Sequence, residues 1–185
     1  MNKAEILIID DEPQIRKLLE ITLLSNGYLV KSATSAKEGL IMAGNHPPEL
    51  ILLDLGLPDE SGHTVLQKLR QWYTNPIIIL SVQKAEEEII KALDNGANDY
   101  LSKPFRTGEL LARIRSVIRN SSNEEGETTM DFDGLTIDLI TRTVKKDNQL
   151  VKLTSTEYNL LALLARNEGK VLTHQFLLRA IWGPG

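Results

Sequence analysis

The sequence predicts an α/β protein, with a doubly wound, five-stranded parallel sheet followed by a smaller, incomplete α+β domain. Over the first 120 residues, short apolar runs alternate with helical patterns, which is typical of βα units. Such units place helices on both faces of a parallel sheet. The expected strands are Glu5–Ile9, Leu29–Ala33, Leu50–Leu53, Ile77–Leu80 and Asp99–Ser102.

Five helices are expected between and after these strands. Ile15, Leu19 and Leu23 belong to the apolar stripe of the first helix. The run from Ser35 to Glu38 has the pattern of a capping box and is expected to open the second helix. Gly96 is expected to stop the fourth helix.

A polar stretch marks the boundary of the first domain. Residues 120–129 contain no apolar side chain, so they cannot contribute to a core and indicate a flexible linker. We therefore predict a first domain at 1–120, a linker at 121–129 and a second domain at 130–185. Small antiparallel strands are expected within Phe132–Asn148, followed by a helix capped by Thr154 and another that starts at Thr173.

Composition excludes several classes of protein. No run approaches the length of a membrane span, and the first residues lead straight into a strand pattern, so we expect a cytoplasmic protein without membrane contact. The absence of cysteine excludes disulfides and thiolate metal sites. The formal net charge of −4 argues against binding to nucleic acid through bulk charge. Residues 130–185 hold seven basic and six acidic side chains, which is a weak footprint for DNA binding.

Residues with a carboxylate, hydroxyl or ammonium group follow four of the expected strands. Asp10 and Asp11 follow the first, Asp54 the third, Ser81 the fourth and Lys103 the fifth. The carboxyl ends of the strands share one edge of a doubly wound sheet, so these side chains are expected to meet in one pocket. Three carboxylates in one pocket repel, by about 3 kcal/mol for two charges ~5 Å apart, so a cation is needed. An all-oxygen site suits Mg²⁺. Because Lys103 and the Ser81 hydroxyl are expected beside this metal site, the pocket is suited to receive a phosphoryl group.

Each of these residues also has an ordinary alternative. Asp11 could cap a helix that begins at Pro13, and Asp54 could be a turn aspartate. Ser81 could be a helix cap, and Lys103 could lie in a surface turn. Their joint occurrence at strand ends of one domain favours the shared pocket.

Four motifs resemble those of the receiver domain of two-component response regulators. The resemblance covers residues 4–120, and the second domain resembles the OmpR/PhoB winged-helix family. Parts of both domains are most similar to regulators of a high-affinity potassium-transport operon. The motifs are Ile8–Glu12, Leu52–Asp59, Ile79–Ser81 and Gly96–Phe105.

The resemblance implies a CheY-like fold and a role for each site residue. Asp54 would accept the phosphoryl group from a sensor histidine kinase. Asp11, Asp54 and the carbonyl of Gly56 would bind Mg²⁺ directly, and Asp10 would bind it through water. Ser81 and Lys103 would bind phosphoryl oxygens, with a cis peptide bond between Lys103 and Pro104. The switch residues would be Ser81 and Tyr100, although Tyr100 could equally be a half-buried strand tyrosine.

The resemblance also implies a homodimer that forms on phosphorylation. Its face would pair Asp99 with Arg113 and Asp94 with Arg115. Three residues depart from the family pattern. Val82 would narrow access to the pocket, and Asn98 and Asn120 would remove an ion pair from the dimer face.

The resemblance implies that the protein controls transcription, including that of potassium-transport genes. It also implies that the protein is not an enzyme. A winged helix needs a recognition helix and a C-terminal wing after Gly183, and neither is present in the sequence. We therefore expect the full-length family to bind promoter DNA and this 185-residue chain not to bind it. One alternative is a truncated or stand-alone receiver that acts through protein partners. A haloacid-dehalogenase-like phosphatase is disfavoured because Asp10–Glu12 lacks the Asp-x-Asp pattern of that class.

Overall fold

A parallel sheet of five strands forms the centre of the first domain, in the order β2-β1-β3-β4-β5. The computed structural model describes residues 3–123 and 129–183. The predicted α/β fold is confirmed, and β3 and β4 each run one residue further than expected, so that they include Asp54 and Ser81. The strands are β1 (Glu5–Ile9), β2 (Leu29–Ala33), β3 (Leu50–Asp54), β4 (Ile77–Ser81) and β5 (Asp99–Ser102).

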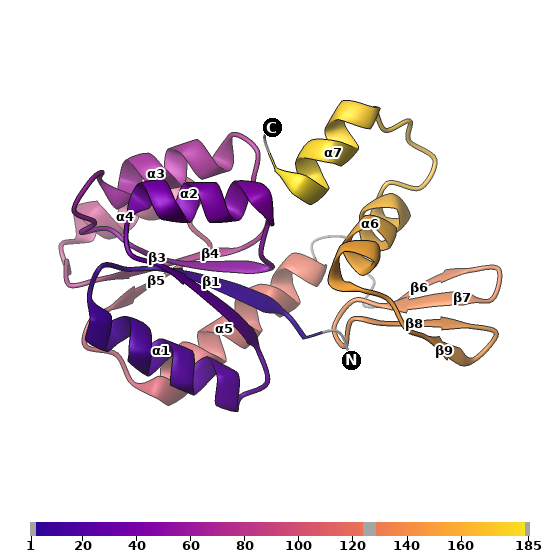
Figure 1. Ribbon diagram of the computed structural model, residues 1–185, viewed down its shortest axis with the longest axis horizontal. Coiled ribbons are helices and arrows are strands. Elements are labelled where there is room, and N and C mark those ends of the chain that lie inside the picture. The colour runs from indigo at the N-terminus through magenta and orange to yellow at the C-terminus, as the bar shows by residue number, and fades with distance from the viewer. Residues whose placement is uncertain (1–2, 124–128, 184–185) are drawn as a thin grey trace.

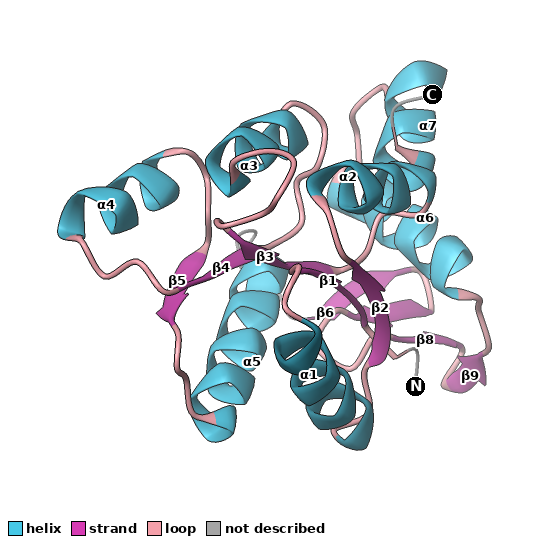
Figure 2. Cartoon of the chain, turned by 60° about the vertical axis from the view of Figure 1, so that its left-hand side comes forward, coloured by secondary structure: helices cyan, strands magenta, loops and turns pink. Residues whose placement is uncertain are grey.

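Helices cover both faces of this sheet (Figures 1 and 2). Alternate residues of a strand point to opposite faces, so Ile6 and Ile8 join a core with α1 and α5, whereas Leu7 and Ile9 join a core with α2, α3 and α4. The side chains at the centre of β1 and β3 are buried in these two cores. The helices are α1 (Pro13–Ser25), α2 (Ala36–Asn45), α3 (Gly62–Arg70), α4 (Glu86–Asp94) and α5 (Thr107–Asn123).

The start of α2 differs from the predicted capping box. Ser35 accepts a hydrogen bond from the Glu38 N–H, as expected, but the Glu38 carboxylate accepts from the N–H and hydroxyl of Thr34. The carboxylate of Asp59, from the loop after β3, accepts from the N–H groups of Ala36 and Lys37 instead. This contact ties the loop that follows Asp54 to α2.

The second domain begins with an antiparallel meander, in the order β6-β7-β8-β9, and continues with two helices. The predicted cap at Thr154 is a complete capping box with Glu157, and Thr173 caps the last helix. A small core forms around Ile137, Val144 and Tyr158. The elements are β6 (Thr129–Phe132), β7 (Leu135–Asp138), β8 (Thr143–Lys146), β9 (Gln149–Val151), α6 (Ser155–Arg166) and α7 (His174–Trp182).

The boundary between the two domains lies near the predicted linker. Helix α5 continues to Asn123, past the expected end of the first domain at residue 120, and β6 begins at Thr129. Residues 124–128 of the predicted linker lie outside the described residues, so the division at 120 and 130 stays a prediction. Within 3–123 and 129–183, none of the helices has the length and apolar character needed to span a membrane.

Candidate functional site

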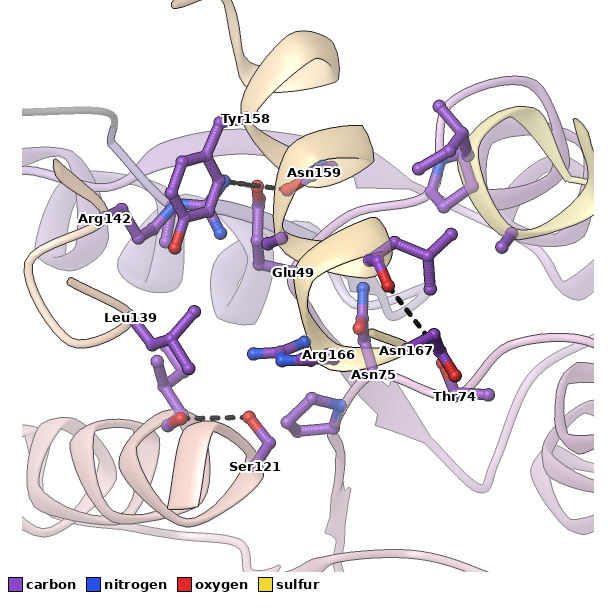
Figure 3. A pocket seen from close by; sticks show the side chains of 18 of the residues that line it. Glu49, Thr74, Asn75, Ser121, Leu139, Arg142, Tyr158, Asn159, Arg166 and Asn167 are labelled. Carbon is purple, nitrogen blue, oxygen red and sulfur yellow. Dashed lines mark hydrogen bonds and ion pairs between the residues drawn. The ribbon is translucent and has the colours of Figure 1, made fainter. Parts of the chain in front are cut away.

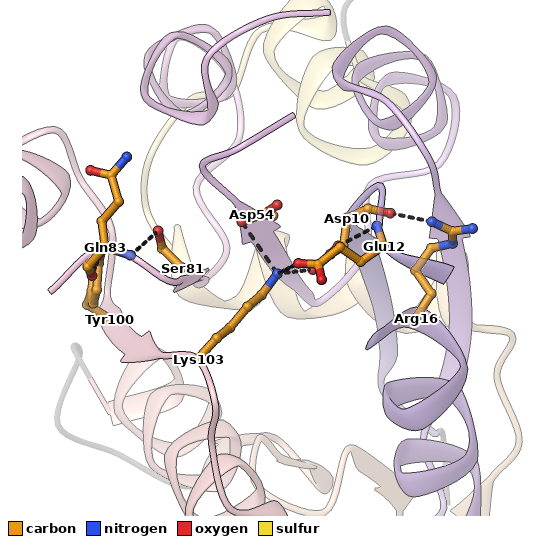
Figure 4. A network of polar contacts seen from close by, with 8 residues as sticks. All are labelled: Asp10, Glu12, Arg16, Asp54, Ser81, Gln83, Tyr100 and Lys103. Carbon is orange, nitrogen blue, oxygen red and sulfur yellow. Dashed lines mark hydrogen bonds and ion pairs between the residues drawn. The ribbon is translucent and has the colours of Figure 1, made fainter. Parts of the chain in front are cut away.

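The sheet brings the predicted pocket residues together at its carboxyl edge (Figure 4). Asp54 ends β3, Ser81 ends β4, and Asp10 and Lys103 directly follow β1 and β5. The exposed fractions of these four residues are 1% for Asp10, 6% for Asp54, 2% for Ser81 and 6% for Lys103. The strand order places β1 between β2 and β3, so the switch point of the sheet lies beside Asp10 and Asp54.

Lys103 is the cation at the centre of this pocket. Its Nζ lies 2.7 Å from a carboxylate oxygen of Asp10, 2.9 Å from Glu12 and 3.6 Å from Asp54. Burial lowers the pKa of Lys103, but the hydrogen bonds to Asp10 and Glu12 outweigh burial and raise it above its usual value. Lys103 therefore stays protonated. The predicted cis peptide bond between Lys103 and Pro104 is confirmed.

The surroundings of Asp54 shift its pKa in opposing directions, with a net rise. Burial raises its pKa, the Lys103 charge opposes that rise, and the negative charge of Asp10 adds to it. The N–H of Gly56 donates a hydrogen bond to Asp54 and favours its charged form. Asp54 is thus a desolvated carboxylate with a lysine 3.6 Å away, which is a suitable environment for an oxygen nucleophile.

Among the described residues, the carboxylates that could share a metal ion are those of Asp10, Glu12 and Asp54. One ligand atom from each lies within 4.8 Å of the others. Asp11, which the family resemblance implies as a direct ligand, is outside this group, and Glu12, which the resemblance does not name, is inside it. The physical reason is that Lys103 draws the Glu12 carboxylate into the pocket. Asp11 remains near enough for its charge to raise the pKa of Asp54.

The two predicted switch residues meet at Gln83. The hydroxyl of Tyr100 donates to the backbone carbonyl of Gln83 at 2.7 Å, and the Ser81 hydroxyl accepts from the Gln83 N–H at 3.2 Å. Tyr100 is 8% exposed, so it is more buried than a half-buried strand tyrosine. Neither the sequence pattern nor the family motifs indicated Gln83, because its backbone rather than its side chain makes these contacts.

The four residues of the expected dimer face differ in the contacts that they make within the chain. Arg113 binds both carboxylate oxygens of Asp99 at 3.0 Å within the same chain, and it also binds Glu109. Asp94 is exposed at the end of α4. Arg115 lies near enough to Tyr28 for its charge to act on that hydroxyl, which places it toward α1. The structure therefore pairs Asp99 with Arg113 but does not join Asp94 and Arg115 within the chain.

The three departures from the family pattern lie in different surroundings. Val82 is 68% exposed, so its side chain is not packed into the pocket. Asn98 directs its Oδ1 toward the Arg70 guanidinium and the Ile77 N–H, at 2.8 and 2.9 Å. Asn120 is exposed on α5. Asn98 thus serves a contact within the chain, with α3 and β4, which the sequence did not indicate.

A doubly wound sheet in this strand order, with clustered acids and a lysine at its carboxyl edge, is the architecture of a receiver domain. Residues 6–115 match the family described as response regulator receiver domain, and residues 147–185 match transcriptional regulatory protein, C terminal. The chain belongs to the two-component response regulators, with an OmpR/PhoB-type second domain. This family regulates transcription and is not a family of enzymes.

The most similar curated relatives include two proteins named KdpE. The chain is 44% identical over 181 residues to transcriptional regulatory protein KdpE of Mycobacterium tuberculosis, covering 97% of this chain and 80% of the relative. It is 44% identical over 182 residues to KDP operon transcriptional regulatory protein KdpE of Escherichia coli, covering 98% of this chain and 81% of the relative.

Solved structures agree with this fold. The response regulator DrrB of Thermotoga maritima, an OmpR/PhoB homologue, aligns with a TM-score of 0.58 at 28% identity, over 98% of this chain and 81% of that one. A CheY-like receiver domain protein of Methanospirillum hungatei aligns with a TM-score of 0.64 at 30% identity, over 66% of this chain and 99% of that one.

Proposed function

We propose that Asp54 is the phosphoacceptor of this response regulator and that a sensor histidine kinase is the donor. The observation that carries the proposal is the placement of Asp54 at the end of β3, 6% exposed and 3.6 Å from the Lys103 ammonium. A carboxylate oxygen of Asp54 forms a bond to phosphorus while the phosphorus–nitrogen bond of the phosphohistidine breaks. The imidazole leaves with the electron pair.

Lys103 and Ser81 have separate tasks in this transfer. Lys103 neutralises charge on the phosphoryl oxygens, and its bonds to Asp10 and Glu12 hold it in place. The Ser81 hydroxyl donates to a phosphoryl oxygen. Transfer of this kind depends on positioning and charge neutralisation, which these buried groups supply.

The carboxylates fit a hard divalent cation, and we propose Mg²⁺. Asp10, Glu12 and Asp54 offer three oxygen ligands within 4.8 Å of one another, a donor set that suits Mg²⁺ when water completes it. Asp11 and the Gly56 carbonyl are the further candidates that the family resemblance supplies. Bound there, the ion would screen the repulsion among the carboxylates and neutralise phosphoryl oxygens.

Labelling with a radioactive acyl phosphate tests the phosphoacceptor. We expect Mg²⁺-dependent, acid-stable and base-labile labelling of the wild-type protein and none of Asp54→Asn. Asp147→Asn, which changes an exposed aspartate of the second domain, is the matched control and should label like the wild type. Wild-type labelling of Asp54→Asn would contradict the proposal.

We propose that the transcription under control includes potassium-transport genes and that the protein acts in the cytoplasm. The support is the 44% identity to relatives named for the KDP operon. Transcript levels in cells limited for potassium provide the test. Replacing the gene by its Asp54→Asn variant should abolish induction of the transport genes, and unchanged induction would contradict the assignment.

Dimerisation on phosphorylation remains part of the proposal, through α4, β5 and α5. Asp99 and Arg113, already paired within the chain, would re-pair across the interface, and Asp94 would pair with Arg115. Sedimentation with and without beryllofluoride measures this association. We expect the mimic to strengthen it and Arg113→Ala to weaken that effect. No change on adding the mimic would count against this face.

A further inference from the structure

An ion pair with little solvent exposure joins the two domains at the edge of the sheet opposite to Asp54. Arg142, in the turn between β7 and β8, lies 2.7 Å from the carboxylate of Glu49, which directly precedes β3 (Figure 3). The side chains are only 13% and 10% exposed. A charged pair that is removed from water to this extent is costly unless both partners are well placed.

Both partners are held in place by their own domains. The Arg142 guanidinium lies 4.2 Å from the ring centre of Tyr158 and donates to the Asn159 side chain at 2.9 Å. The Glu49 carboxylate accepts a hydrogen bond from the Glu5 N–H. Preorganisation of this kind reduces the entropy that is lost when two charged side chains meet.

A second contact lies where α7 ends. Gly183 is so close to the end of α2 that a Cβ placed on it would overlap the carbonyl oxygen of Gly44. Gly183 also has a φ of +80°, which favours glycine. The backbones of the two domains therefore touch here, at a point distinct from the ion pair.

Between these contacts lies a cavity of about 360 Å³, lined by residues of both domains. Three of its polar groups already have partners, because the amides of Asn75 and Asn167 and the hydroxyl of Ser121 donate to backbone carbonyls. The Nε of Arg142 is buried without a hydrogen-bond partner. The interface is thus incompletely packed, unlike a permanent domain core.

We propose that the amino edge of the receiver sheet is a reversible docking surface for this chain's own second domain, with the Glu49–Arg142 pair as its latch. The occupant is the segment 129–183, since it supplies Arg142, Tyr158 and Gly183. The latch lies at the start of β3 and Asp54 at its end, a strand's length or roughly 15 Å away. Docking therefore leaves the phosphoacceptor edge open.

Distance measurements between two labels test this proposal. The chain has no cysteine, so Lys91→Cys on α4 and Lys170→Cys between α6 and α7 provide unique sites for spin labels. We expect a narrow distance distribution for the otherwise wild-type protein. Arg142→Glu places two like charges at the latch and should broaden the distribution and move it to longer distances. The exchanged pair Arg142→Glu with Glu49→Arg should restore part of the narrow distribution.

Two controls separate docking from folding. Lys68→Glu breaks the exposed pair of Lys68 with Glu60, within the receiver, and should leave the distribution unchanged. Circular dichroism shows whether each variant keeps its helices, and the milder Arg142→Ala replaces any variant that does not. A broad distribution in the wild type, or an unchanged one in a folded Arg142 variant, would overturn the proposal. The experiment uses unphosphorylated protein, so its failure would leave the role of Asp54 intact.

Discussion

The hydroxyl of Tyr100 donates a hydrogen bond of 2.7 Å to the backbone carbonyl of Gln83, and the N–H of the same Gln83 donates to the side chain of Ser81. One residue of the loop after β4 is thus bonded on both sides. A movement of Ser81 toward a phosphoryl group on Asp54 would pull on Gln83, and Tyr100 is bonded to that residue. This arrangement is a physical link between the two predicted switch residues.

Removing the Tyr100 hydroxyl should loosen this loop. Tyr100→Phe leaves the Gln83 carbonyl without its donor, so we expect the free energy of unfolding to fall by about 1 kcal/mol. Urea denaturation measures this difference. Tyr28→Phe is the control, because the Tyr28 hydroxyl has no hydrogen-bond partner among the described residues. An equal loss in both variants would argue against the Gln83 contact.

Because the pKa of Asp54 is raised, removing the charge of this side chain should increase the stability of the folded protein by an amount that depends on pH. Burial and the Asp10 and Asp11 charges raise this pKa above its ordinary value of 3.8, despite Lys103, so the folded state binds the proton more tightly than the unfolded state. The stability contributed by this group is therefore fully present below pH 3.8 and is lost as pH rises through the folded-state pKa.

Asp54→Asn removes that loss. Without divalent cations, the variant should be more stable than the wild type at pH 7, and the difference should shrink as the pH approaches 4. Urea denaturation in a chelator at the two pH values measures it. Equal stability at pH 7 would mean that Lys103 fully compensates the buried carboxylate.

Asn98→Asp should strengthen a contact within the chain. The Asn98 Oδ1 accepts from Arg70 and the Ile77 N–H, and a carboxylate there would pair with the Arg70 charge. We expect a gain of roughly 0.2–1 kcal/mol in the free energy of unfolding, which high salt should reduce. Asn120→Asp adds the same charge at an exposed position of α5 and should give no such gain.

The sequence predicted the sheet and the pocket because both depend on local patterns. Apolar runs define strands of four or five residues, and the residues that follow parallel strands must share one edge. The position of the Glu12 carboxylate in the pocket was not predictable, since it depends on how the loop after β1 turns and on where Lys103 reaches. The partners of Asn98 and Arg142 come from distant parts of the chain, and no periodicity relates them.

Two glycines with positive φ give the last prediction. Gly183 and Gly169 have φ values of +80° and +74°, so an alanine at either position should introduce backbone strain of about 1–3 kcal/mol. They differ in their surroundings, because a Cβ on Gly169 would meet nothing within 4 Å, whereas a Cβ on Gly183 would overlap the Gly44 carbonyl. Only Gly183→Ala should therefore separate the end of α7 from α2. Hydrogen exchange measures the outcome, and we expect faster exchange in α7 and at the end of α2 for Gly183→Ala than for Gly169→Ala. Equal exchange in the two variants would show that strain alone accounts for the effect and that the domains do not touch at Gly44.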